Sequence, residues 1–95
     1  MKELPSGFGW VDTTGDDIDV RLSRAIRHYF KKFGAFPSVV YTNKAAIGDY
    51  KLPDAKAVGL DGVLRSAIAA GLKLVGHEQI WWTTFILHPD PRKET

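Results

Sequence analysis

The strongest constraint on the fold is an apolar period that runs from about Asp16 to Phe33. Seven apolar side chains recur there at spacings of three and four residues: Ile18, Leu22, Ala25, Ile26, Tyr29, Phe30 and Phe33. At 100° per residue they fall within an arc of about 140°, which predicts an amphipathic helix. Burial of its large apolar members contributes roughly 10 kcal/mol before the entropy cost. We therefore expect this helix to anchor the core, with Phe30→Ala among the most damaging truncations.

The residues at both ends of this segment agree with a helix. Thr13 or Thr14 is predicted to cap its start, and Gly34 to end it in the left-handed conformation. Three carboxylates lie near the positive end of the helix dipole and two lysines near the negative end: Asp16, Asp17, Asp19, Lys31 and Lys32.

The rest of the chain alternates between further strands and helices. The predicted elements are a strand over 7–12, a strand over 36–42, a short helical turn over 44–47 capped by Asn43, a helix over 61–70, and strands over 72–75 and 79–87. The last two strands are predicted to pair as an antiparallel hairpin around the turn 76–78.

This order, in a chain of 95 residues with 44% apolar content, predicts one small α+β domain. Two main helices are expected to pack on a mixed sheet of three or four strands. The domain is predicted to span residues 7–88, between a flexible N-terminus over 1–6 and a flexible C-terminal tail over 89–95.

Two segments are unusually apolar for a chain of this size. The helix over 61–70 has one interior charge, Arg65, so we expect it to be buried on most sides or to meet another subunit. The strand over 79–87 is apolar on both faces, and it should lie centrally in its sheet or pair across a dimer. These segments support the hypothesis of a homodimeric interaction or assembly protein.

The charge distribution is the strongest functional signal. Between Val20 and Gly48 there are six Lys and Arg and no carboxylate, although the formal net charge of the whole chain is only +2. The cationic side chains and one histidine that form the predicted polyanion-binding face are Arg21, Arg24, Arg27, His28, Lys31, Lys32 and Lys44. A row of this kind on a helix contacts several phosphates of a nucleic acid or an acidic protein surface. The same pattern is also typical of a solvated helix face without a ligand.

Three tryptophans give a second signal. Trp81 and Trp82 are adjacent, so in a strand they point to opposite faces of the sheet. Together with Trp10 they are candidate interface aromatics, because exposed tryptophan suits base stacking or a protein contact. The alternative is that both adjacent rings are buried in the small core.

Few residues in the sequence are candidates for catalysis. The chain has no cysteine, and its three histidines lack the spacing of metal ligands, so no metal, cofactor or catalytic residue is predicted. A third hypothesis, a metal-free RNA hydrolase, would use His28 as base and Arg24 or Lys31 to stabilise the transition state.

The sequence also bears on where the protein acts. The longest uncharged apolar run, 80–87, is too short to span a membrane, and the first residues lack the apolar run of a secretory signal. We therefore expect a cytoplasmic protein with no membrane partner. The leading hypothesis is a small non-catalytic binding module that contacts nucleic acid or an acidic protein surface through its basic helix face.

Overall fold

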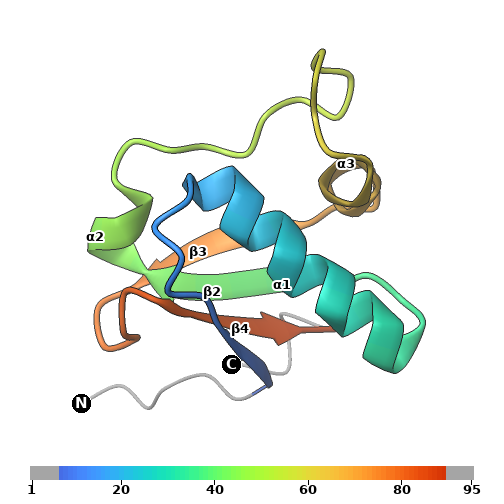
Figure 1. Ribbon diagram of the computed structural model, residues 1–95. Coiled ribbons are helices and arrows are strands. Elements are labelled where there is room, and N and C mark those ends of the chain that lie inside the picture. Colours follow the sequence, from blue (N-terminus) through green and yellow to red (C-terminus); the bar gives the residue numbers. More distant parts are fainter. Residues whose placement is uncertain (1–6, 90–95) are drawn as a thin grey trace.

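Four strands and three helices make up residues 7–89, the part of the chain that the computed structural model describes (Figure 1). In chain order they are β1 (Phe8–Val11), α1 (Ile18–Phe33), β2 (Val39–Asn43), α2 (Lys44–Ile47), α3 (Gly62–Ala69), β3 (Lys73–His77) and β4 (Thr84–His88). The predicted α+β class, with two main helices on a mixed sheet, is confirmed. The predicted flexible segment 1–6 lies outside the described residues, as does the predicted tail except for Pro89.

The sheet has the strand order β1-β4-β2-β3. β4 is antiparallel to both of its neighbours, and β2 is parallel to β3, with Val39 opposite Lys73. The predicted central position of the last strand is confirmed, whereas the predicted hairpin is wrong because β2 lies between β3 and β4. Residues 78–83 therefore cross two strand spacings, about 10 Å, before β4 begins.

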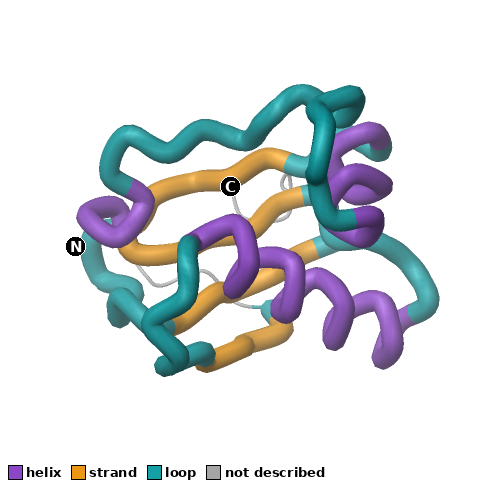
Figure 2. Tube along the Cα trace, turned by 45° about the horizontal axis from the view of Figure 1, so that its top comes forward, coloured by secondary structure: helices purple, strands orange, loops and turns teal. Residues whose placement is uncertain are grey.

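The two longer helices, α1 and α3, lie on the same face of the sheet (Figures 1 and 2). The core fills the space between these helices and that face. Its buried members are Leu22, Ala25, Ile26 and Tyr29 from α1, Leu64 and Ala67 from α3, Val40 from β2, Phe85 and Leu87 from β4, and Leu72. The apolar period of α1 therefore faces the core over most of the helix length, as its spacing predicts.

The two ends of α1 differ in how well the sequence predicts them. Gly34 ends the helix in the left-handed conformation, with φ of 72°, and its N–H donates to the carbonyl of Phe30, so this prediction is confirmed. The cap prediction is wrong, because the N-cap is Asp17 and neither Thr13 nor Thr14 occupies that position. Thr14 instead accepts the N–H of Asp16 in the loop before the helix.

The last turn of α1 extends beyond the end of the sheet (Figure 1). Sixteen helical residues span about 24 Å, whereas five-residue strands such as β2 and β4 span about 17 Å. Phe30 and Phe33 consequently remain 40% and 53% exposed. The expectation that Phe30 is a central core residue is therefore wrong, although its spacing continues the apolar period.

The shorter helices begin at side-chain caps. Asn43 accepts the N–H of Ala46 at 2.9 Å, which confirms the predicted cap of α2. Asp61 accepts the N–H groups of Val63 and Leu64 at the start of α3. Only two residues of α3 are fully buried, so the prediction that this helix is buried on most sides is wrong.

Candidate functional site

The cationic residues of α1 fall into distinct environments, beginning with Arg21 in the first turns. Arg21 is buried, its Nε donates to the carbonyl of Asp16 at 3.0 Å, and its guanidinium lies 5.9 Å from the centre of the Phe85 ring. The expectation that Arg21 belongs to a solvated polyanion-binding face is therefore wrong. Its position lies at the border of the apolar arc, where a long side chain packs its stem on the core.

Arg24 is held by the loop that precedes α1. Its two terminal nitrogens lie 3.2 Å from Asp12 and 2.6 Å from Asp16, and one of them also donates to Thr14 at 3.0 Å. These contacts raise the pKa of Arg24 through hydrogen bonds to Asp16 and Asp12. Since two carboxylates already balance its charge, Arg24 is a weak candidate for contact with an external anion.

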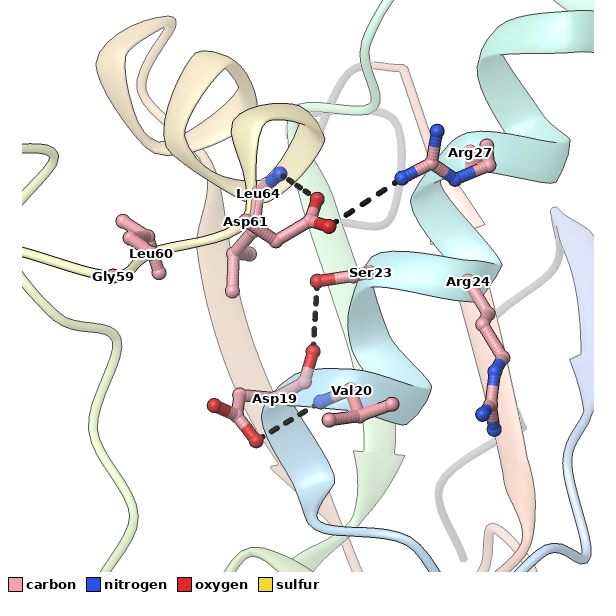
Figure 3. Close-up of a pocket in the computed structure, with 9 residues that line it drawn as sticks. All are labelled: Asp19, Val20, Ser23, Arg24, Arg27, Gly59, Leu60, Asp61 and Leu64. Carbon is pink, nitrogen blue, oxygen red and sulfur yellow. Dashed lines mark hydrogen bonds and ion pairs between the residues drawn. The ribbon is translucent and has the colours of Figure 1, made fainter.

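Arg27 lies one turn further along, beside the start of α3. Its Nη2 is 3.4 Å from a carboxylate oxygen of Asp61, whose other oxygen caps α3 (Figure 3). Both side chains of this pair remain about half exposed to solvent, and exposed pairs of this kind contribute little stability. Arg27 therefore retains donors for a second anionic partner, because its guanidinium carries five N–H groups.

A cavity of about 400 Å³ lies between α1 and the chain that leads into α3. Its lining residues are Asp19, Val20, Ser23, Arg24, Arg27, Gly59, Leu60, Asp61 and Leu64 (Figure 3). Ser23 donates to the carbonyl of Asp19, and the carboxylate of Asp19 accepts the N–H of Val20. Ser23 and Asp19 are thus engaged with the backbone, and Asp61 with Arg27 and the start of α3, which does not favour a nucleophile and base arrangement.

His28 stacks on Trp10 of β1. The two ring centres are 3.9 Å apart and the ring planes are inclined by 21°. Trp10 is half-buried and also packs against the core, so it covers one face of the imidazole. This stacking places both rings in a contact within the domain, so Trp10 is a weak candidate for a free interface aromatic.

The last turn of α1 presents lysines beside exposed aromatic rings. Among residues 7–89, the ion pairs include neither Lys31 nor Lys32. The ammonium group of Lys32 lies 5.5 Å from the centre of the Phe8 ring and 5.7 Å from that of Phe33. We refer to the exposed residues Phe30, Lys31, Lys32 and Phe33 as the terminal surface of α1; they surround the last turn, with Lys31 on the side of Phe30 and Lys32 on the side of Phe33.

A groove of about 440 Å³ adjoins this surface on the side of α3. It is lined by Arg27, Phe30 and Lys31 of α1, by Phe36 of the following loop, and by Gly62, Val63 and Ser66 of α3. The Phe30 and Phe36 rings pack against each other with their centres 4.7 Å apart. The groove therefore has apolar walls, two cations at its rim and no carboxylate among its lining residues.

The remaining predicted site residues lie elsewhere. Lys44 belongs to α2, at the other end of the molecule from the terminal surface of α1 (Figure 1), and its ammonium group is 4.0 Å from Glu78. Trp81 and Trp82 lie in the turn before β4 and are 69% and 48% exposed. The prediction that they point to opposite faces of a strand is wrong, because β4 begins only at Thr84.

The described residues give no indication of a metal centre or a membrane segment. Within residues 7–89, the histidine, aspartate and glutamate side chains form no group of three that is able to hold a metal ion. No helix in the same range has the length and apolar content needed to cross a membrane. Comparison with protein-family models, curated proteins and solved structures gives no match to this chain.

Sequence reasoning missed the groove and the positions of three aromatic residues at or beside it. The apolar period predicts that Phe30 and Phe33 lie in the core, and the composition of 36–42 predicts that Phe36 lies in a strand. The predicted strands over 36–42 and 79–87 are longer than the five-residue strands β2 and β4 of the structure, so the mismatch in length between α1 and the sheet could not be read from the sequence. That mismatch leaves one end of the helix without a sheet beneath it.

Proposed function

We propose that the protein is a small non-catalytic binding module that recognises a polyanionic partner with the terminal surface of α1. The observation that carries this proposal is the division of charge along the helix. Arg21 and Arg24 are engaged near its start, whereas Lys31 and Lys32 are exposed at its end beside Phe30 and Phe33.

The combination of cations with exposed rings supports binding better than charge alone. Exposed lysines attract anions at long range, although salt screens this attraction over about 10 Å at 0.1 M. Exposed aromatic side chains add apolar contact area once a partner has docked. The terminal surface of α1 supplies both within one helical turn, and Arg27 adds a third cation one turn earlier.

The geometry favours binding over the RNA hydrolase hypothesis. The proposed base, His28, has one ring face covered by Trp10, and Arg24 is balanced by two carboxylates. A transition-state stabiliser must direct its donors at the developing charge on the substrate. Arg24 directs its donors at its own loop.

The experiment is a charge reversal with a matched control. The Lys31→Glu/Lys32→Glu protein should bind fluorescein-labelled nonaglutamate and oligothymidylate at least tenfold more weakly than the parent at low salt, measured by anisotropy. The control, Lys51→Glu/Lys56→Glu, changes the net charge equally at two exposed loop positions and should alter the dissociation constant less than threefold. Equal losses in both proteins, or no binding of either probe by the parent, would overturn the proposal.

A second candidate function is self-association through the turn that precedes β4. Exposed Trp81 and Trp82 favour it, because large exposed apolar side chains commonly mark protein interfaces. Sedimentation equilibrium at high micromolar concentration tests it. A dimer that Trp81→Ala/Trp82→Ala dissociates supports this function, and a monomeric parent protein excludes it.

A further inference from the structure

The groove between α1 and α3 owes its shape to small side chains on α3. Gly62 and Ser66 are four residues apart, so they lie above one another on the same side of the helix. Neither fills the space in front of α1, and a Cβ added to Gly62 would meet no atom within 4 Å. Phe30 and Phe36 close the groove on the opposite side.

Charge is distributed unevenly around this groove. Arg27 and Lys31 stand on its α1 side, and its α3 side contributes the neutral residues Gly62, Val63 and Ser66. The nearest carboxylate in the sequence of α3 is Asp61, which is directed at Arg27 and at the first N–H groups of the helix (Figure 3). The groove is therefore complementary to an apolar group that is flanked by negative charge.

We propose that this groove binds an acidic peptide segment of a partner protein, with one apolar side chain of the peptide inserted between Phe36 and Val63. Carboxylates on either side of that side chain pair with Lys31 and with the remaining donors of Arg27. This mode is the one by which apolar anchors dock into helix-lined grooves, with charges at the rim setting orientation. The proposal rests on the proposed function and names the class of its partner.

The same observations favour a peptide over a nucleic acid. Nucleic-acid binding requires a track of cations along the phosphate backbone, whereas this rim has two cations, one of which is paired with Asp61. A continuous phosphate chain over Arg27 would also pass close to the Asp61 carboxylate and be repelled by it. A peptide meets less of this repulsion, because it needs to place only one carboxylate beside Arg27, whereas a nucleic acid carries a charge at every nucleotide.

The test compares nonapeptides that differ at one position. The probes are fluorescein-labelled nonaglutamate and three derivatives with leucine, phenylalanine or tryptophan at the central position. We expect at least one derivative to bind the parent protein five times or more as tightly as nonaglutamate. No gain from any central apolar residue would overturn the proposal.

Two groove-filling variants locate the binding position. Ser66→Trp and Gly62→Leu fill the groove from different turns of α3. Each should abolish the gain in affinity that the central apolar residue of the peptide provides, whereas Ser66→Ala should preserve this gain in affinity. Because these variants leave Lys31 and Lys32 in place, binding of nonaglutamate should change less than twofold. Thermal melts establish that each variant is folded, and the second variant serves if the first does not fold.

The outcomes separate this proposal from the one on which it rests. A gain that persists in both folded groove-filling variants overturns the groove as the docking site, even if charge reversal at Lys31 and Lys32 weakens binding. If these variants lose oligothymidylate binding while their binding of the nonapeptides is unchanged, the groove is a nucleic-acid site. That result would also overturn the proposal that the groove binds an acidic peptide. Failure of the proposed function has a different signature, since charge reversal would then leave nonaglutamate binding unaltered.

Discussion

Two phenylalanines that lie in opposite environments give a direct test of the packing. Phe85 of β4 is 1% exposed at the centre of the sheet, whereas Phe30 at the end of α1 is 40% exposed. Truncation of a fully buried phenylalanine costs about 3–5 kcal/mol, because it removes apolar burial and leaves a cavity. Burial of a whole phenylalanine side chain contributes about 1.5–3 kcal/mol. The partial burial of Phe30 therefore implies a cost of about 1–2 kcal/mol, without a closed cavity.

Urea denaturation of the parent, Phe85→Ala and Phe30→Ala measures this difference. We expect the free energy of unfolding to fall at least 1 kcal/mol further for Phe85→Ala than for Phe30→Ala, with similar dependence on urea concentration. If Phe85→Ala proves too unstable to purify, the partial truncations Phe85→Leu and Phe30→Leu give a matched comparison, with the larger loss again expected at Phe85. Equal losses from the two alanine substitutions would show that the end of α1 is packed as tightly as the centre, which would refute the exposed terminal surface.

Two further predictions concern the loops. Asn43→Ala should lower the free energy of unfolding in urea by about 1–2 kcal/mol, because Asn43 caps α2 and donates to the carbonyl of Ile80 at 2.8 Å. Asn43→Asp keeps the cap and should lower the free energy of unfolding by about half as much. Equal losses from the two substitutions would argue against the cap. Burial raises the pKa of Asp12, but hydrogen bonds from Thr14 and Arg24 outweigh the effect of burial, so the pKa of Asp12 lies below its usual value of 3.8. Hydrogen bonds from Arg24 and Thr14 likewise lower the pKa of Asp16 below 3.8. Their contribution to stability is present above the unfolded-state pKa and is lost as the pH falls through the lower folded-state values. Between pH 5 and pH 2 the melting temperature of the parent should therefore fall more steeply than that of Arg24→Gln, and parallel curves would contradict this ion-pair cluster.

Features set by local sequence were predictable. The apolar period located α1, Gly34 marked its end, and Asn43 marked the start of α2. Each of these depends on residues a few positions apart, where helix geometry relates spacing directly to contact. The central position of β4 followed from its two apolar faces.

Features set by distant contacts were not predictable from the same patterns. Arg27 meets Asp61, which lies 34 residues away, and Arg24 meets Asp12, which lies 12 residues away. An acid-free stretch of sequence therefore does not guarantee a free basic surface, because the fold brings carboxylates to it from other segments. The parallel pairing of β2 with β3 likewise depends on how α3 crosses the sheet, which strand composition does not reveal.

The most direct measurement of the binding surface is an amide chemical-shift titration of the parent protein with nonaglutamate at low salt. The largest saturable shifts should fall in residues 27–33 at the end of α1. Shifts concentrated instead around Arg24 and its loop, around Lys44, or in the turn that carries Trp81 and Trp82 would contradict the assignment of the end of α1 as the anion-binding surface.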